Sequence, residues 1–380
     1  MSSSKARFDY DCLETIRRRE KLKELRRQLS KKGPPQQSIS FSGLLRHILT
    51  ILVVIIAISY AIFANYPEPP LSPILYQWKS IGDEVERAFS YRGNKIFYID
   101  KTNVDIKAED SLTMLYLHGF PTSSFDLHQI FGNLTRNFHR IIAPDMIGFG
   151  FSDKPRFYSY SVLDQANLII ELLKMLDLKR IHLLSHDYGD TVAQELLARQ
   201  HEGKLSFEIV SLCMMNGGIF PSIHRPIFSQ KLLRTPLIGT IISKFGNYYL
   251  FSISFSSVFG PKTQPSRELL TDSWKLIRLQ DGYRVWGSLL TYIDERFEHE
   301  DRWVGAIRRA MIPFHFIYGR LDPVNPSPQF ETHFRKIIHS PGNVVIIDDA
   351  GHYPQIELPD TVVGKYLQFL LDNRFISSIR

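Results

Sequence analysis

Three polar residues between positions 187 and 352 have the types and order that nucleophilic catalysis requires. Asp187 stands between Ser185 and Gly189 in the stretch SHDYGD, which has the spacing of a sharp turn that exposes a nucleophile. Asp322 follows in YGRLDPVNP, and His352 follows in DDAGHYPQIE. The order of nucleophile, acid and histidine predicts a catalytic triad in which an aspartate occupies the usual position of a serine.

An aspartate nucleophile implies a different reaction from a serine nucleophile. A carboxylate is already ionised at neutral pH, and the amino terminus of a following helix favours its negative charge. It can attack an electrophilic carbon directly and form an ester with the substrate. His352, oriented by Asp322, would then activate the water that cleaves this ester, while the backbone N–H groups of Phe120 and Tyr188 hold the oxyanion. These residues predict a two-step hydrolysis of alkyl electrophiles.

The elements that must position these residues alternate along the chain. Apolar runs that end in turn residues predict strands at 95–100, 112–120, 139–145, 180–185, 207–216, 312–319 and 343–352. Apolar residues at helical spacing predict helices at 161–178 and 190–200. The alternation predicts an α/β fold with a mostly parallel sheet and helices on both faces, and each triad residue then lies at the carboxyl end of a strand.

The alternation stops in one long segment before the last two strands. Residues 218–309 are helical in character and rich in aromatic residues. We expect this segment to form a helical lid, inserted between a first part of the core at 78–217 and a second part at 310–380. Its aromatic content favours an apolar pocket and a small apolar or lipid-like substrate.

The charge of the chain is concentrated at its amino terminus. The net charge is +7, but residues 1–47 carry 12 Lys/Arg and 5 Asp/Glu, which leaves 34 of each kind in the rest. The balanced remainder argues against a nucleic-acid partner. With two cysteines, no zinc-ligand spacing and no complete dinucleotide fingerprint, the sequence predicts neither a metal nor a cofactor.

An apolar stretch follows the basic segment. Residues 44–66 contain a charge-free run that is long enough to span a bilayer. The basic residues within 1–43 predict a cytosolic tail, which either lies on anionic lipid or is surrounded by water. A proline-rich spacer at 67–77 would connect this anchor to the body. We expect a single-pass protein of the endoplasmic reticulum whose body is lumenal, and Asn133 in the triplet NLT is a glycosylation candidate.

Several motifs resemble one branch of a known family. HGFPTSS, SHDYGDTVAQELL, NGGIFP, FIYGRLDPVNP and GHYPQIE are similar to the motifs of the epoxide hydrolase and haloalkane dehalogenase branch of the α/β hydrolases. Within that branch they most resemble a membrane-anchored animal group, the mesoderm-specific transcript family. The resemblance covers roughly residues 70–380. It implies the α/β-hydrolase fold, an aspartate nucleophile and an oxyanion loop at residues 117–121.

The resemblance also suggests which electrophile is attacked. Epoxide hydrolases protonate the ring oxygen with lid tyrosines, and Tyr292 lies near where that family carries one of them. Tyr248 or Tyr249 is a candidate for a second. Dehalogenases commonly carry a tryptophan after the nucleophile, where this chain has Tyr188, and a donor side chain where it has Phe120. These departures favour an epoxide over a haloalkane.

Two other functions are consistent with the same sequence. The fold and the triad could persist in a protein that acts only as a binding partner or scaffold. A lipid esterase or acyl-transfer enzyme is a third interpretation. The aspartate disfavours it, because attack of a carboxylate on an ester gives a reactive anhydride.

Overall fold

The structure is a computed structural model, and it describes residues 4–31, 41–64, 67–83, 89–106, 112–235, 238–337 and 343–380. The chain divides into two compact units, residues 1–65 and residues 66–380, which we describe separately and call the N-terminal unit and the body.

The N-terminal unit contains two helices, α1 (Ser4–Lys31) and α2 (Phe41–Ala64). Within the described residues, one helix is long and apolar enough to cross a membrane: the segment Ser42–Ser59 of α2 has a mean hydropathy of 2.1 over 18 residues. Its Ile, Val and Leu side chains are exposed, as expected of a helix whose apolar partner would be lipid. The helix begins three residues before the predicted anchor, and residues 65–66 lie outside the described ones.

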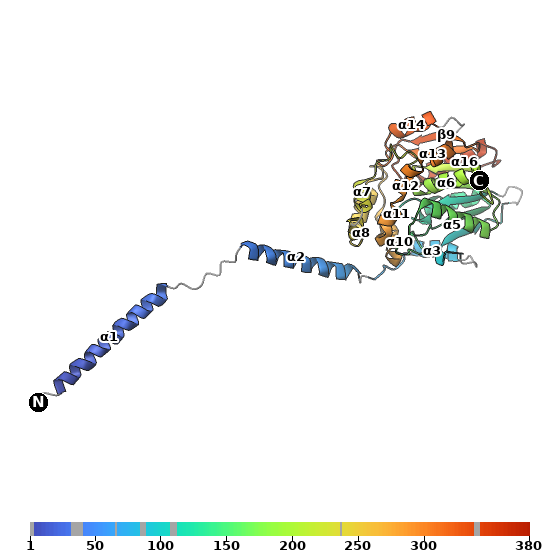
Figure 1. The fold of residues 1–380 in the computed structure, drawn as a ribbon. Coiled ribbons are helices and arrows are strands. Elements are labelled where there is room, and N and C mark those ends of the chain that lie inside the picture. The colour runs from blue at the N-terminus through green and yellow to red at the C-terminus, as the bar shows by residue number, and fades with distance from the viewer. Residues whose placement is uncertain are drawn as a thin grey trace. The chain divides into compact units, whose positions relative to one another are not determined.

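The body is built on a mostly parallel sheet (Figure 1). Among the described residues, seven strands form this sheet in the order β3-β5-β4-β6-β7-β8-β9, with β3 antiparallel to β5 and every other neighbouring pair parallel. A separate antiparallel pair, β1 (Phe89–Tyr91) and β2 (Asn94–Ile96), precedes it. The strands of the main sheet are β3 (Tyr98–Thr102), β4 (Thr113–Leu117), β5 (Arg140–Pro144), β6 (Arg180–His186), β7 (Glu208–Met215), β8 (Phe314–Gly319) and β9 (Asn343–Ile347).

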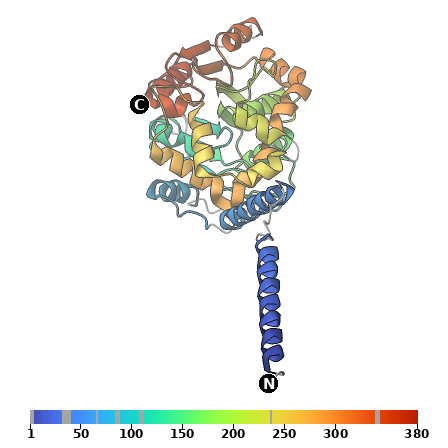
Figure 2. The same ribbon diagram turned by 90° about the vertical axis from the view of Figure 1, so that its left-hand side faces the viewer.

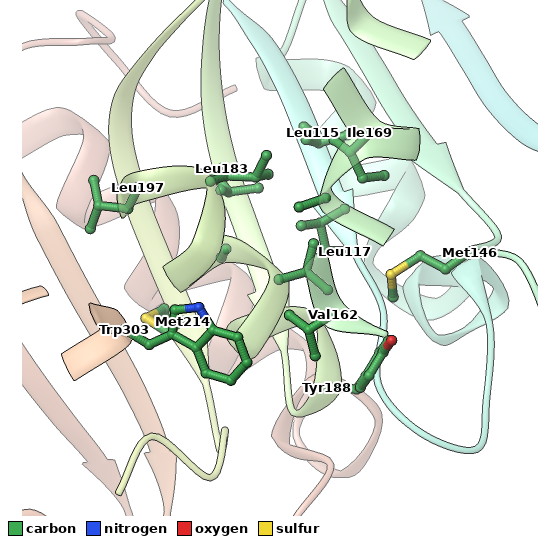
Figure 3. Packing of buried hydrophobic residues seen from close by; sticks show 14 of the residues in the cluster. Leu115, Leu117, Met146, Val162, Ile169, Leu183, Tyr188, Leu197, Met214 and Trp303 are labelled. Atoms are coloured by element: carbon green, nitrogen blue, oxygen red, sulfur yellow. The ribbon is translucent and has the colours of Figure 1, made fainter. Parts of the chain in front are cut away.

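The two faces of the sheet bury alternate residues of each strand. In β4, Leu115 and Leu117 enter one apolar cluster, whereas Met114 and Tyr116 enter the other. Figure 3 shows the first cluster, in which Leu115, Leu117, Leu183 and Met214 lie beneath side chains of the overlying helices. These strands are continuous apolar runs because both of their faces are covered.

Helices cover both faces of the sheet. The first cluster includes α5 (Val162–Met175), α6 (Tyr188–His201) and α13 (Glu300–Arg308), which is the last helix of the insertion. The second includes α3 (Pro73–Asp83), α4 (His128–Asn137) and α16 (Pro359–Asp372). The remaining elements are the 3₁₀ helix η2 (Ser124–Leu127), α14 (Gln329–Ile337) and α15 (Pro354–Glu357). The predicted α/β fold with helices on both faces is confirmed.

Between β7 and β8 the described chain is helical, and we call residues 218–309 the insertion. Its first helices, yellow in Figure 2, lie on the side of the body that faces the viewer, whereas its last helix, α13, packs on α6. The helical elements of the insertion are α7 (Phe228–Arg234), α8 (Ile238–Ser243), α9 (Tyr248–Ser256), α10 (Arg267–Arg278), the 3₁₀ helix η3 (Leu279–Val285), α11 (Trp286–Leu289), α12 (Tyr292–Glu298) and α13. Aromatic contacts such as Phe251 with Phe255 and Trp274 with Trp286 pack these short helices together.

One predicted boundary needs correction. The proline-rich spacer was expected at 67–77, but residues 73–83 form helix α3, which belongs to the body. Leu75 is fully buried, and the indole N–H of Trp78 donates to the hydroxyl of Ser124 at 3.2 Å. Pro73 opens the helix at a position where a missing N–H costs nothing. The extended segment is therefore limited to residues 67–72.

Candidate functional site

Asp187 lies at the turn between β6 and α6, in a backbone conformation that side chains rarely adopt. Its φ is 46° and its ψ is −106°. The turn is tight because Gly189 lies against β4: a Cβ atom at this position would be 2.3 Å from the carbonyl oxygen of Leu117. Strained backbone of this kind is typical of functional turns, and it places the Asp187 side chain beyond the carboxyl end of β6.

The three predicted triad residues lie together although they are far apart in sequence. His352 Nδ1 is 2.9 Å from Asp322 Oδ2, which is the distance of a charge-assisted hydrogen bond. His352 Nε2 is 3.7 Å from Asp187 Oδ1. All three side chains are buried. The imidazole therefore stands between two carboxylates, in the geometry of a base held by one acid and facing another.

Asp322 is held more firmly than the sequence alone indicates. The amides of Asn216 and Asn325 each donate to its Oδ2 at 3.0 Å, and the backbone N–H of Val324 donates to its Oδ1 at 2.8 Å. Burial acts to raise the pKa of Asp322, but the charge and hydrogen bond of His352 and these amides outweigh it and lower the pKa. Asn216 follows β7 directly, and the sequence analysis did not identify it.

The electrostatics of the triad favour a charged histidine. Burial acts to lower the pKa of His352, but the charge of Asp322 and the hydrogen bonds to both carboxylates raise it to about 10. For Asp187, burial acts to raise the pKa, and the hydrogen bond and charge of His352 together with Arg296 lower it. The site at neutral pH therefore holds two carboxylates, one imidazolium and one guanidinium, all desolvated.

Phe120, the predicted oxyanion donor, directs its backbone N–H at the candidate nucleophile. This N–H donates to Asp187 Oδ2 at 3.1 Å. The hydroxyl of Tyr353 donates to the carbonyl oxygen of Phe120 at 2.9 Å and so fixes the loop from the other side. Tyr188 opens α6 directly after Asp187, and its buried ring packs at right angles to that of Tyr292. Tyr353 adjoins His352 in the sequence, but nothing in its motif indicated this contact.

His118 supports the same loop rather than acting as a base. Its Nε2 accepts from the backbone N–H of Met146 at 3.0 Å, and its Nδ1 donates to the carbonyl oxygen of Gly119 at 2.9 Å. This pattern requires the neutral ring, and burial lowers the pKa of His118 accordingly. The histidine thus joins the loop after β4 to the loop after β5.

Tyr292, the predicted acid, is brought to the site at the start of α12. It is fully buried, and its hydroxyl has no hydrogen-bond partner among the described residues. Burial and the negative charge of Asp187 raise the pKa of Tyr292, so its proton is retained at neutral pH. The candidates for a second tyrosine lie on α9: Tyr249 is 76% exposed, and the ring of Tyr248 packs against that of Tyr249.

Arg296 is a site residue that the sequence analysis missed. It is 1% exposed, and one guanidinium nitrogen, Nη2, lies 3.8 Å from Asp187 Oδ1. Its Nε donates to Thr191 Oγ1 at 2.9 Å, and its charged carbon lies 4.5 Å from the centre of the Tyr292 ring. The remaining nitrogen, Nη1, has no hydrogen-bond partner among the described residues. Nη1 lies against Gly218, where a Cβ atom would be 2.2 Å from it, and the guanidinium and His352 together balance the charges of Asp187 and Asp322.

A cavity of about 370 Å³ leads to the triad. His352 and Phe120 lie in its wall, and both contact Asp187. Most of the other lining side chains are apolar and come from the insertion, among them Ile227, Leu233, Phe251, Phe255 and Trp286. A cavity of this size and lining accommodates a small apolar molecule.

Asn133, the glycosylation candidate, lies within α4 and is partly buried. Its side-chain oxygen accepts a hydrogen bond from Arg136, and its carbonyl oxygen accepts from the amide of Asn137 at 2.9 Å. The structure leaves the proposed modification untested.

The fold and the motifs together place the chain in a family. The model of the Alpha/beta hydrolase family matches residues 114–365, and the chain belongs to this family. It is 47% identical over 316 residues to the mesoderm-specific transcript homolog protein of Bos taurus, covering 82% of this chain and 92% of that protein. The predicted resemblance to this group is confirmed.

Solved structures show the same fold. The haloalkane dehalogenase DbeA from Bradyrhizobium elkani superposes with a TM-score of 0.61 at 22% identity, covering 74% of this chain and 97% of that chain. The epoxide hydrolase CorEH superposes with a TM-score of 0.58 at 19% identity, covering 75% and 98%. At these identities the likeness concerns the fold.

Proposed function

We propose that the body is a hydrolase that uses Asp187 as a nucleophile and opens an apolar epoxide through a covalent ester. The observation that carries the proposal is the position of His352, hydrogen-bonded to Asp322 at 2.9 Å and facing Asp187 at 3.7 Å. A carboxylate in a serine's position needs no base for its own attack, but the ester that it forms does need one. The geometry supplies both groups.

In the first step, Asp187 Oδ1 attacks one ring carbon while the bond from that carbon to the ring oxygen breaks. The ring oxygen departs as an alkoxide that remains attached to the substrate through the other ring carbon. Tyr292 offers a hydroxyl proton to this oxygen, and the unused Nη1–H of Arg296 stabilises its negative charge. The product of the step is a hydroxyalkyl ester of Asp187.

In the second step, ester formation itself prepares the base. Esterification removes the negative charge of Asp187, which is one of the causes of the raised pKa of His352. The pKa therefore falls, and His352 can return its proton to the tyrosinate left at Tyr292 and then accept one from water. The water oxygen attacks the ester carbonyl, and the N–H of Phe120, 3.1 Å from the carboxylate oxygen in the resting site, holds the oxyanion. The bond between the acyl carbon and the ester oxygen that carries the substrate breaks, His352 gives its proton to that oxygen, and the diol leaves. The second water proton passes from the Asp187 carboxyl to His352, which restores the ion pair.

The proposal extends to the location of the protein. The apolar lining of the cavity supports a lipid-like or aromatic epoxide. The apolar helix α2 supports a single-pass anchor, and the basic residues before it support a cytosolic amino terminus with anionic lipids as partners. We place the body on the lumenal side of the endoplasmic reticulum membrane, with Asn133 as the modified asparagine.

Trapping the ester tests the mechanism. A set of aromatic and long-chain epoxides is first screened on the purified protein to find one that is turned over. With that epoxide, His352→Gln should still be alkylated but should not be hydrolysed, so the peptide that contains Asp187 gains the mass of the substrate. Asp187→Ala should gain none. Each variant should lose several powers of ten in turnover, about 4–8 kcal/mol in barrier.

Two results would redirect the assignment. If wild type turns over an epoxide but His352→Gln carries no adduct, the covalent scheme is wrong. If no electrophile or ester is turned over and Asp187→Ala preserves the cellular role, the protein acts as a binding partner on a hydrolase fold. Turnover of a lipid ester without an epoxide reaction would favour the esterase alternative.

A further inference from the structure

The rim of the cavity exposes large apolar side chains that nothing in the described chain covers. Phe228, Leu250 and Ile253 line the cavity and are 79%, 57% and 72% exposed. Ile238, Ile241 and Tyr249 are also exposed on the same run of helices, α7 to α9. We call these six residues the apolar rim. Single exposed apolar residues are ordinary on proteins, but six on three successive helices around a cavity form an interaction surface.

The chain segment that carries the apolar rim has charges of one sign. Between Glu208 and Glu268 the chain contains no acidic residue, whereas it contains six basic ones: Arg225, Lys231, Arg234, Lys244, Lys262 and Arg267. Lys231 on α7 and Lys244 just after α8 are exposed, and α7 and α8 contact each other. In Figure 1 both helices lie at one side of the body. Asp294 neutralises Arg234 at 2.6 Å, whereas no ion pair is found for Lys231 or Lys244 among the described residues. An apolar surface bordered by these two lysines complements a surface that is apolar inside and anionic at its edge.

We propose that the apolar rim binds the surface of a bilayer that contains anionic lipids. Phe228, Leu250 and Ile253 then enter the boundary between head groups and acyl chains, while Lys231 and Lys244 contact phosphate groups. A second copy of the chain fits less well, because its rim would bring the same basic residues against these. The chain also carries a candidate membrane-spanning helix, which favours a bilayer over a soluble partner as the occupant of the rim.

Binding through the rim would determine how substrate enters. The residues that meet the bilayer also line the mouth of the cavity, so an electrophile dissolved in the acyl chains reaches His352 without crossing water. This consequence rests on the proposed function, whereas binding itself requires no activity. The two therefore fail separately, and each needs its own measurement.

Depth measurements on the full-length chain in vesicles test binding. In a Cys12→Ser background, where Cys213 is fully buried, a single cysteine at Ile253 carries an environment-sensitive fluorophore. Met311 provides the matched control, because it is 93% exposed and precedes β8 at the opposite, amino-terminal edge of the sheet. Spin-labelled lipid in phosphatidylcholine vesicles with phosphatidylserine should quench the fluorophore at 253 several-fold more than at 311. Equal quenching at both positions, or none at either, overturns the proposal.

Charge substitution tests the consequence for substrate entry. Ile241, on the rim but outside the cavity lining, is the position to change. Ile241→Glu should reduce turnover of a long-chain epoxide dissolved in the vesicles several-fold and leave turnover of styrene oxide added in water unchanged. Met311→Glu should change neither. Equal effects of Ile241→Glu on both epoxides would refute entry from the bilayer. A protein that turns over neither epoxide contradicts the hydrolase proposal, and the quenching ratio alone then decides whether the rim binds lipid.

Discussion

Nε2 of His352 lies 3.7 Å from Oδ1 of Asp187, and both side chains are buried. At this distance, away from water, the charge of each residue stabilises the charge of the other. The relationship makes the resting site an ion pair, and it makes the basicity of His352 depend on whether Asp187 carries its charge.

The ion pair predicts a pH dependence of stability. The pKa of His352 is raised from its ordinary value to about 10, so its charge adds stability in full below about pH 6.5 and ceases to do so as the pH rises through about 10. Thermal unfolding of wild type should therefore lose several degrees over this window. Asp187→Asn should show a shallower loss, because its His352 has the lower pKa. If Asp187→Asn lost thermal stability with pH as steeply as wild type, the coupling between the two residues would be refuted. Asp105→Asn, at an exposed position, is the control.

The elbow predicts an asymmetric response to glycine substitution. Gly189→Ala would place a Cβ atom 2.3 Å from the backbone oxygen of Leu117, so β4 or α6 must shift. We expect a loss of about 2 kcal/mol or more in unfolding free energy, together with a loss of turnover. Gly364→Ala, in the exposed interior of α16 with open space around it, should gain up to about 1 kcal/mol. Chemical unfolding of both variants measures the contrast, and equal effects would contradict the steric explanation.

The site residues that could be predicted from the sequence are those that lie at the ends of strands. Asp187, Asp322 and His352 each end or follow an apolar run, and parallel strands bring such ends to one edge of a sheet. Arg296 could not be predicted in this way. Its relation to Tyr292, four residues earlier on α12, shows only that the two share a helix face, and its contact with Asp187 depends on how the insertion folds over the elbow.

The same reasoning explains the corrected boundary and the position of the candidates for a second tyrosine. Residues 73–77 look like a spacer because Pro67, Pro69, Pro70 and Pro73 lie at and before their start, and only the burial of Leu75 and Trp78 against the body shows that they belong to it. From the sequence alone, Tyr248 and Tyr249 are as plausible as Tyr292 as tyrosines that reach the site. They lie on α9, where Tyr249 is 76% exposed, and this position depends on the packing of short helices with little apolar periodicity.

The topology gives a third prediction. If α2 spans the membrane with residues 1–43 in the cytosol, protease added to sealed microsomes should remove the tail and leave the body intact until detergent is added. A glycosidase should shift the mobility of wild type but not that of Asn133→Gln. Digestion of the body without detergent would place it in the cytosol, and an unchanged mobility would remove only the glycosylation.

Arg296 leads to the sharpest prediction about chemistry. If its free Nη1–H stabilises a departing alkoxide, its removal should slow reactions in proportion to how poor the leaving group is. In the His352→Gln background, Arg296→Met should slow alkylation of Asp187 by styrene oxide by roughly 100-fold or more. Alkylation by 4-nitrobenzyl bromide should slow much less, because its leaving group, bromide, is a stable anion without help from a donor. Arg296→Lys keeps the charge but loses the planar fork, so its rate of alkylation by styrene oxide should lie between those of the proteins with Arg and with Met at this position. Arg308→Met, at an exposed position on α13, is the matched control and should change neither rate. If Arg296→Met slows both reagents equally, Arg296 supports the shape of the site and does not act on the leaving group.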